Sequence, residues 1–179
     1  MNLANKLTML RILLIPFFMA LVFIDFPAAN LWAAVIFVFA AATDGLDGYI
    51  ARKRKEITNL GKLLDPLADK LLVAAALIAL VETSRIPSWI ATIIIGRELM
   101  VTGLRGVAAE EGLVIAAGKL AKVKTLFQIL ALTILLVERD FFAIPGFSPG
   151  SWLLYLAMFL TVYTGYDYMA KTFTQIKMT

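Results

Sequence analysis

Residues 44–52 read DGLDGYIAR and, after eight intervening residues, residues 61–69 read GKLLDPLAD. Four aspartates, at positions 44, 47, 65 and 69, therefore stand at the ends of two long apolar segments. If these segments cross a bilayer, each charge near its centre costs about 2.5–3.5 kcal/mol on insertion scales. The four carboxylates must therefore face a polar cavity, a cation, or both.

The composition around this stretch is that of a membrane protein. The chain has 179 residues, 61% of them hydrophobic, and a mean hydropathy of +0.85. These values favour one helical membrane domain over residues 1–179. The absence of Cys and His excludes a disulfide framework, a thiolate nucleophile and an imidazole base. Any metal must be held mainly by oxygen, which favours Mg²⁺, Mn²⁺ or Ca²⁺.

Long apolar runs predict an all-α integral membrane fold with six transmembrane helices, since each helix needs about 20 residues to cross a bilayer. We expect the helices near residues 8–26, 31–50, 61–81, 87–106, 118–137 and 152–170, after a short interfacial segment at 2–7. The basic residues 52–55 are expected in the loop after the second helix. Pro66 fits the third helix if it lies in the first turn, where its missing N–H matters least.

Basic residues collect at one end of these predicted helices, and only Arg85 and Arg139 fall at the other end. Cytoplasmic loops carry an excess of Lys and Arg. We therefore predict a multi-pass protein of the cell membrane with both termini in the cytoplasm. The four aspartates then lie near the cytoplasmic boundary. The net charge of +4 suits an anionic membrane surface or an anionic substrate, and does not choose between them.

The spacing of the aspartates places them on two helical stripes, because positions three and four apart share a helix face. Asp44 and Asp47 form one stripe with Gly48, and Asp65 and Asp69 form the other. Four carboxylates in one pocket repel one another unless cations or protons compensate them. One or two divalent ions would do so, as in two-metal phosphoryl transfer. The competing interpretation is that the aspartates simply face water at the helix ends.

The pattern D-x-x-D-G-x-x-A-R, eight residues, G-x-x-x-D-x-x-x-D resembles the signature of the CDP-alcohol phosphotransferase family at every fixed position. Four further stretches resemble the bacterial branch that takes glycerol 3-phosphate as its acceptor. They are NKLTMLR at 5–11, LDPLADK at 64–70, GRE at 96–98 with Arg105, and KVKT at 122–125. One departure is Ala121, where that branch commonly has Gly.

This resemblance implies roles for individual residues. Two divalent cations, Mg²⁺ or Mn²⁺, would be held by Asp44, Asp47, Asp65 and Asp69, and Asp69 would also be the general base. The donor substrate, CDP-diacylglycerol, would contact Gly48, Arg52, Thr58, Asn5 and Thr8. The resemblance also implies six transmembrane helices, a homodimer surrounded by membrane lipids, and a site that opens to the cytoplasmic leaflet.

The acceptor is chosen by other residues. A basic pocket would suit a phosphorylated alcohol, and the candidates for it are Arg97, Arg105, Lys122 and Lys124. Glu98 is either exposed or fixes one of these arginines. The branch resemblance favours glycerol 3-phosphate over inositol phosphate, inositol or serine. The competing interpretation of these cations is ordinary positive charge on the cytoplasmic side.

Two non-enzymatic alternatives remain open. Intramembrane aspartates also occur in cation transporters and channels, although the outer halves of the predicted helices carry almost no acidic residues. A purely structural membrane protein is the third possibility. Scattered basic residues give no indication of nucleic-acid binding.

Overall fold

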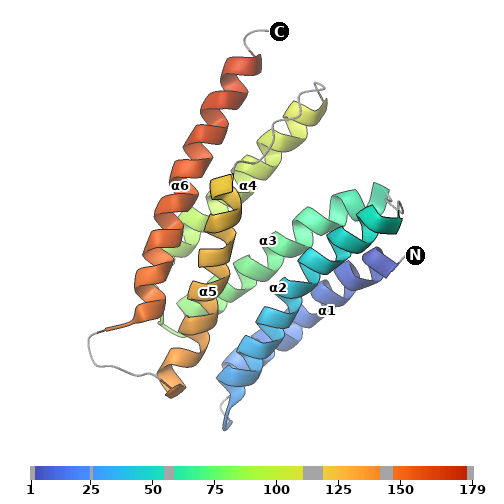
Figure 1. Ribbon diagram of the computed structural model, residues 1–179. Coiled ribbons are helices and arrows are strands. Elements are labelled where there is room, and N and C mark those ends of the chain that lie inside the picture. The colour runs from blue at the N-terminus through green and yellow to red at the C-terminus, as the bar shows by residue number, and fades with distance from the viewer. Residues whose placement is uncertain (1–2, 25, 55–58, 111–118, 142–146, 177–179) are drawn as a thin grey trace.

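The computed structural model describes residues 3–24, 26–54, 59–110, 119–141 and 147–176 (Figure 1). Within these ranges the chain forms six α-helices. They are α1 (Leu3–Phe23), α2 (Ala29–Arg54), α3 (Asn59–Glu82), α4 (Ser88–Glu110), α5 (Lys119–Phe141) and α6 (Pro149–Ile176). The predicted all-helical architecture is therefore confirmed for this part of the chain.

The helices run alternately up and down, so both termini lie at the same end of the bundle (Figure 1). We call this the terminal end. It also holds the end of α2, the start of α3, the end of α4 and the start of α5. α1 packs against α2 and α3, α5 packs against α2 and α6, and α4 packs against α3 and α6. Alternating direction thus brings the end of α2 and the start of α3 together, as the aspartate pattern requires.

The helices extend beyond the predicted apolar segments. Residues 3–7 belong to α1 and are not a separate interfacial segment. Residues 52–54 were predicted in a loop, but they continue α2, because Lys and Arg are good helix formers. α3 begins at Asn59, so Pro66 lies beyond the first turn and leaves the carbonyl of residue 62 without its helical donor. α4 continues without a break through Gly96, Arg97 and Glu98.

The interior of the bundle contains apolar residues of all sizes, from Ala33 to Phe37, and several polar ones, and the outer surface is also rich in large apolar side chains. Phe17 and Trp152 are 65% and 68% exposed, but Arg11 is fully buried. Arg11 Nε donates to the carbonyl oxygen of Ala40 at 3.1 Å and to Thr43 Oγ1 at 3.4 Å. An outer surface this rich in large apolar side chains is unlike that of a water-soluble bundle.

By length and composition, one helix among the described residues qualifies as a membrane span, namely Asn5–Phe23 of α1 with a mean hydropathy of 2.0. A shorter apolar stretch covers Ala29–Thr43 of α2. Two other helices carry charged side chains within their apolar sequence: α3 contains Asp65, Asp69 and Lys70. α4 contains Arg97, Glu98 and Arg105. The structure is compatible with a membrane protein.

Arg85 joins three segments at the opposite end of the bundle. Its Nη1 donates to the carbonyl oxygens of Leu135 at 3.0 Å and Leu136 at 2.8 Å, near the end of α5. Its Nη2 donates to Asn30 Oδ1 at 2.8 Å, in the first turn of α2. Asn30 Nδ2 in turn donates to Asp140 at 2.9 and 3.1 Å. We call Arg85, Asn30 and Asp140 the end clamp.

We expect Arg85→Ala to destabilise the fold without removing any group near the aspartates. Hydrogen bonds to charged groups contribute about 1.5–3 kcal/mol each, and these bonds are not additive. A loss of about 2 kcal/mol would lower the melting temperature of the detergent-solubilised protein by roughly 4–8 °C. The matched variant Arg85→Lys keeps the charge and should recover part of the loss. An unchanged melting temperature for Arg85→Ala would show that the clamp contributes nothing to stability.

Candidate active site

The four aspartates lie on two neighbouring helices at the terminal end. Asp44 and Asp47 are in the last three turns of α2, and Asp65 and Asp69 are one turn apart in the first half of α3. α2 packs against α3. The side chains of Asp44, Asp47, Gly48 and Arg52 lie outside what the structure describes, so only their helical positions can be stated. Thr58 lies outside the described residues altogether.

Asp65 and Asp69 each have polar neighbours from this end of the bundle. Thr8 Oγ1, on the buried face of α1, donates to Asp65 Oδ1 at 2.6 Å. Lys70 Nζ lies 3.9 Å from Asp69 Oδ2. Asn5 is buried one turn before Thr8 on the same helix. The structure therefore brings Thr8, one of the predicted donor-binding residues, into direct contact with a predicted metal ligand.

The donor set fits a hard divalent cation. Among the side chains that the structure describes, no group of three or more Asp, Glu, His or Cys residues could hold a metal ion. Asp65 and Asp69 place carboxylate oxygens on one face of α3, and Asp44 and Asp47 occupy helical positions three apart on the adjacent α2. Carboxylate oxygens are the ligands that Mg²⁺ and Mn²⁺ prefer.

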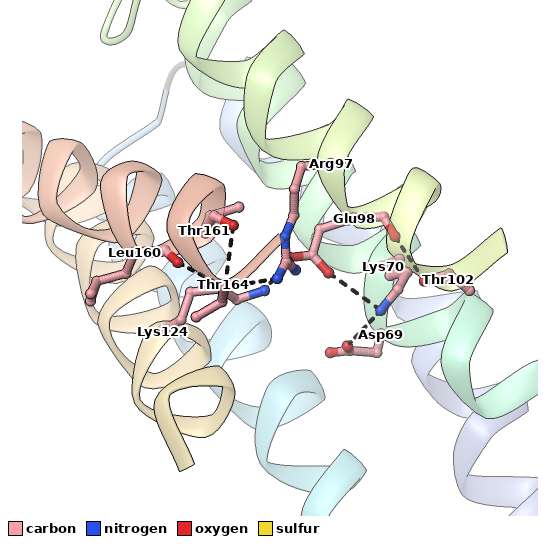
Figure 2. Close-up of polar contacts among 9 residues, drawn as sticks. All are labelled: Asp69, Lys70, Arg97, Glu98, Thr102, Lys124, Leu160, Thr161 and Thr164. Atoms are coloured by element: carbon pink, nitrogen blue, oxygen red, sulfur yellow. Dashed lines mark hydrogen bonds and ion pairs between the residues drawn. The ribbon is translucent and has the colours of Figure 1, made fainter. Parts of the chain in front are cut away.

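A second polar group centres on Glu98 of α4 (Figure 2). Its Oε1 accepts from Lys124 Nζ of α5 and from Arg97 Nη1 at 3.1 Å. Its Oε2 lies 3.5 Å from Lys70 Nζ of α3. We call Lys70, Arg97, Glu98 and Lys124 the basic cluster. It holds three cations and one carboxylate, so two positive charges are not compensated by Glu98.

The basic cluster is shielded from solvent and connected to α6. The exposed fractions of its side chains are 5% for Lys124, 14% for Arg97, 15% for Glu98 and 20% for Lys70. Arg97 Nη2 donates to Thr164 Oγ1 of α6 at 2.8 Å (Figure 2). Gly165 permits this approach, because a Cβ there would lie 2.8 Å from Arg97 Nε and 3.0 Å from its Cγ. A low-dielectric site of excess positive charge is suited to an anion.

Two of the four predicted acceptor residues join this cluster, and two do not take part in its hydrogen bonds and ion pairs as described. Arg97 and Lys124 belong to it. Arg105 lies two turns further along α4, with its guanidinium carbon 5.5 Å from the centre of the Tyr168 ring. Lys122 is exposed on α5. The hypothesis that Glu98 fixes an arginine is confirmed by its contact with Arg97.

Sequence reasoning missed Lys70, which connects the two polar groups. Lys70 contacts Asp69 on one side and Glu98 on the other (Figure 2). Its position directly after Asp69 in the LDPLADK stretch was the available signal. Sequence reasoning also missed the buried Arg11, which binds α2 immediately before Asp44 through Ala40 and Thr43. The described aspartates and the basic cluster therefore form one continuous polar region.

An apolar cavity of about 410 Å³ borders this region between α3 and α4. Lys70 and Glu98 are the charged residues in its lining, and the rest of the lining is apolar, including Leu67, Leu71 and Leu99. The polar region thus adjoins a space suited to hydrocarbon.

Comparison with known proteins gives concordant matches. A family model described as CDP-alcohol phosphatidyltransferase matches residues 1–163. A protein of Bacillus subtilis (strain 168) is 45% identical, with 98% of this chain and 97% of the relative covered. A protein of Rickettsia bellii is 41% identical, with 93% of each chain covered. A protein of Pseudomonas fluorescens is 40% identical, with 99% of this chain and 93% of the relative covered. All three relatives are named CDP-diacylglycerol–glycerol-3-phosphate 3-phosphatidyltransferase.

Proposed function

The chain belongs to the CDP-alcohol phosphatidyltransferase family, and from this premise we propose that it transfers the phosphatidyl group of CDP-diacylglycerol to glycerol 3-phosphate. The products are phosphatidylglycerophosphate and CMP. The observation that carries the choice of acceptor is the basic cluster, which a single residue, Lys70, joins to Asp69. A shielded site with excess positive charge suits an acceptor that carries a phosphate, and free serine or inositol would not need it.

In this proposal Asp69 is the general base. Its carboxylate takes the proton from an acceptor hydroxyl, and the resulting oxygen attacks the phosphorus on the lipid side of the diphosphate. The bond from that phosphorus to the bridging oxygen breaks, and CMP leaves with the electron pair. The rate enhancement comes mainly from positioning and charge stabilisation, with proton transfer contributing about 10²–10⁴-fold.

We assign the cofactors to the aspartates. The family is generally dependent on divalent metals. Asp44, Asp47, Asp65 and Asp69 would hold two Mg²⁺ or Mn²⁺ ions, which would neutralise charge on the diphosphate when bound. Gly48, Arg52, Thr58, Asn5 and Thr8 would bind the CDP-lipid. The contact of Thr8 with Asp65 supports a location beside the metal ligands.

We also propose that all six helices cross the cell membrane as a homodimer, with both termini and the active site on the cytoplasmic side. The large exposed apolar side chains of the outer surface support contact with membrane lipids. Excess positive charge at the terminal end supports the orientation. The apolar cavity beside Lys70 suits a donor that has both a charged headgroup and acyl chains.

The proposal is tested with purified protein, CDP-diacylglycerol and Mg²⁺ or Mn²⁺. CMP release would be followed with glycerol 3-phosphate, inositol phosphate, inositol or serine as the acceptor. We expect release with glycerol 3-phosphate alone. Release with another alcohol instead would keep the mechanism and overturn the acceptor. No release with any acceptor from folded protein would favour cation transport.

A further inference from the structure

One carboxylate, that of Glu98, contacts three cations. Glu98 contacts Lys124 and Arg97 through Oε1 and Lys70 through Oε2. These cations come from α5, α4 and α3, and Arg97 extends the connection to Thr164 of α6. Three like charges drawn this close repel one another. Without an anion between them they would separate toward solvent, so Glu98 determines where they lie.

The basic cluster lies next to Asp69, the proposed general base, so it can position a substrate for that residue. Lys70 Nζ lies between Asp69 Oδ2 and Glu98 Oε2, at 3.9 Å and 3.5 Å. Asp69 would accept the proton of the acceptor hydroxyl. A phosphate held by the cations would therefore be at a fixed offset from the hydroxyl that reacts. A phosphate monoester carries about −1.5 to −2 at pH 7, and the three cations exceed the two carboxylates that contact them, Glu98 and Asp69, by one positive charge.

We propose that Glu98 is the positioning residue of the acceptor site: it holds Lys70, Arg97 and Lys124 in place to bind the phosphate of glycerol 3-phosphate at a set distance from Asp69. This inference rests on the proposed function and extends it. It adds Lys70 to the cations of the acceptor site. Glu98 acts by holding these cations in place and does not itself contact the substrate. The cluster then contributes both affinity and orientation for the acceptor.

Glu98→Gln keeps the shape of the side chain and removes its charge. We expect the KM for glycerol 3-phosphate to rise about tenfold or more, because an amide cannot hold three cations together. The KM for CDP-diacylglycerol should change less than about twofold, since Gln keeps the shape of the side chain that lines the apolar cavity and none of the proposed CDP-binding residues belongs to the basic cluster. Inorganic phosphate should compete with glycerol 3-phosphate in the unmodified protein and about tenfold more weakly in the variant. Glu98→Asp keeps the charge and should give an intermediate KM.

The matched control is Glu138→Gln. Glu138 is also half-buried and accepts hydrogen bonds, from Ser148 Oγ at 2.6 Å and Gly150 N at 3.1 Å, but it lies at the opposite end of the bundle. We expect both KM values to be unchanged in this control. Equal shifts of both KM values in Glu98→Gln, or no shift in either, would overturn the inference.

A second variant tests the inference without changing any charge. A Cβ at Gly165 must displace Arg97, whereas a Cβ at Gly103 of α4 meets nothing within 4 Å. We expect Gly165→Ala to raise the KM for glycerol 3-phosphate selectively and Gly103→Ala to leave it unchanged. If Glu98→Gln does not accumulate as folded protein, the comparison of Gly165→Ala with Gly103→Ala tests the inference without it. Equal KM values for glycerol 3-phosphate in these two variants would overturn the inference. Failure of the unmodified protein to release CMP with glycerol 3-phosphate would instead overturn the proposed function.

Discussion

Asp69→Asn should give a folded protein in which the rate of CMP release is reduced by about 10³-fold or more. The amide is nearly the same size as the carboxylate, but it cannot accept the proton of the acceptor hydroxyl, and general-base catalysis contributes about 10²–10⁴-fold. Loss of a negative charge also weakens the proposed metal site. The measurement is the initial rate at saturating CDP-diacylglycerol and glycerol 3-phosphate, together with the melting temperature.

The matched control for this prediction is Asp167→Asn. Asp167 pairs with Lys171 at 2.6 Å on the exposed surface of α6. Its replacement should leave the rate unchanged, because an exposed pair contributes at most about 1 kcal/mol to stability. Excess Mg²⁺ should not restore Asp69→Asn, since added metal cannot replace a base. Activity near that of the unmodified protein would remove Asp69 from the role of base.

Removal of divalent metal should abolish CMP release. Four aspartates at the end of α2 and in the first half of α3 would repel one another if uncompensated, and a diphosphate adds further negative charge. We expect chelation by EDTA to reduce the rate about 10³-fold or more, and added Mg²⁺ or Mn²⁺ to restore it. EDTA saturated beforehand with Mg²⁺ is the control for effects of the chelator itself.

Metal content gives a second readout that does not depend on turnover. Protein dialysed with Mn²⁺ should retain about two ions per chain, and Asp65→Asn should retain fewer. Full activity in protein shown to be free of divalent metal would contradict the cofactor assignment.

The helices were predictable because apolar stretches of about 20 residues between polar turns are an unambiguous pattern. Their ends were less predictable. Nothing in hydropathy distinguishes a basic loop from a basic final helical turn, so residues 52–54 were assigned to a loop although they continue α2. The start of α3 at Asn59 was missed for the same reason, because Asn59 and Leu60 precede the apolar stretch.

The positions of the aspartates on two adjacent helices followed from spacing alone, because helical periodicity fixes which residues share a face. The basic cluster could not be obtained in this way. Glu98 meets Lys70 and Lys124 across 28 and 26 residues of chain, so the contacts depend on how α3, α4 and α5 cross. Arg105 illustrates the same limit, since its position over the ring of Tyr168 depends on the packing of α4 against α6.

The end clamp has a consequence for how the polar region can open. Arg85 ties the turn between α3 and α4 to the end of α5 and, through Asn30, to the start of α2. Leu135 lies eleven residues after Lys124 on α5, which is about 16 Å along a helix that rises 1.5 Å per residue. If α5 tilts about the clamp, the clamp is the fixed point and Lys124 lies at the far end of the moving segment. A tilt of about 5° would move Lys124 by about 1.4 Å over that length. Any tilt of α5 about the clamp would therefore displace Lys124 far more than Leu135.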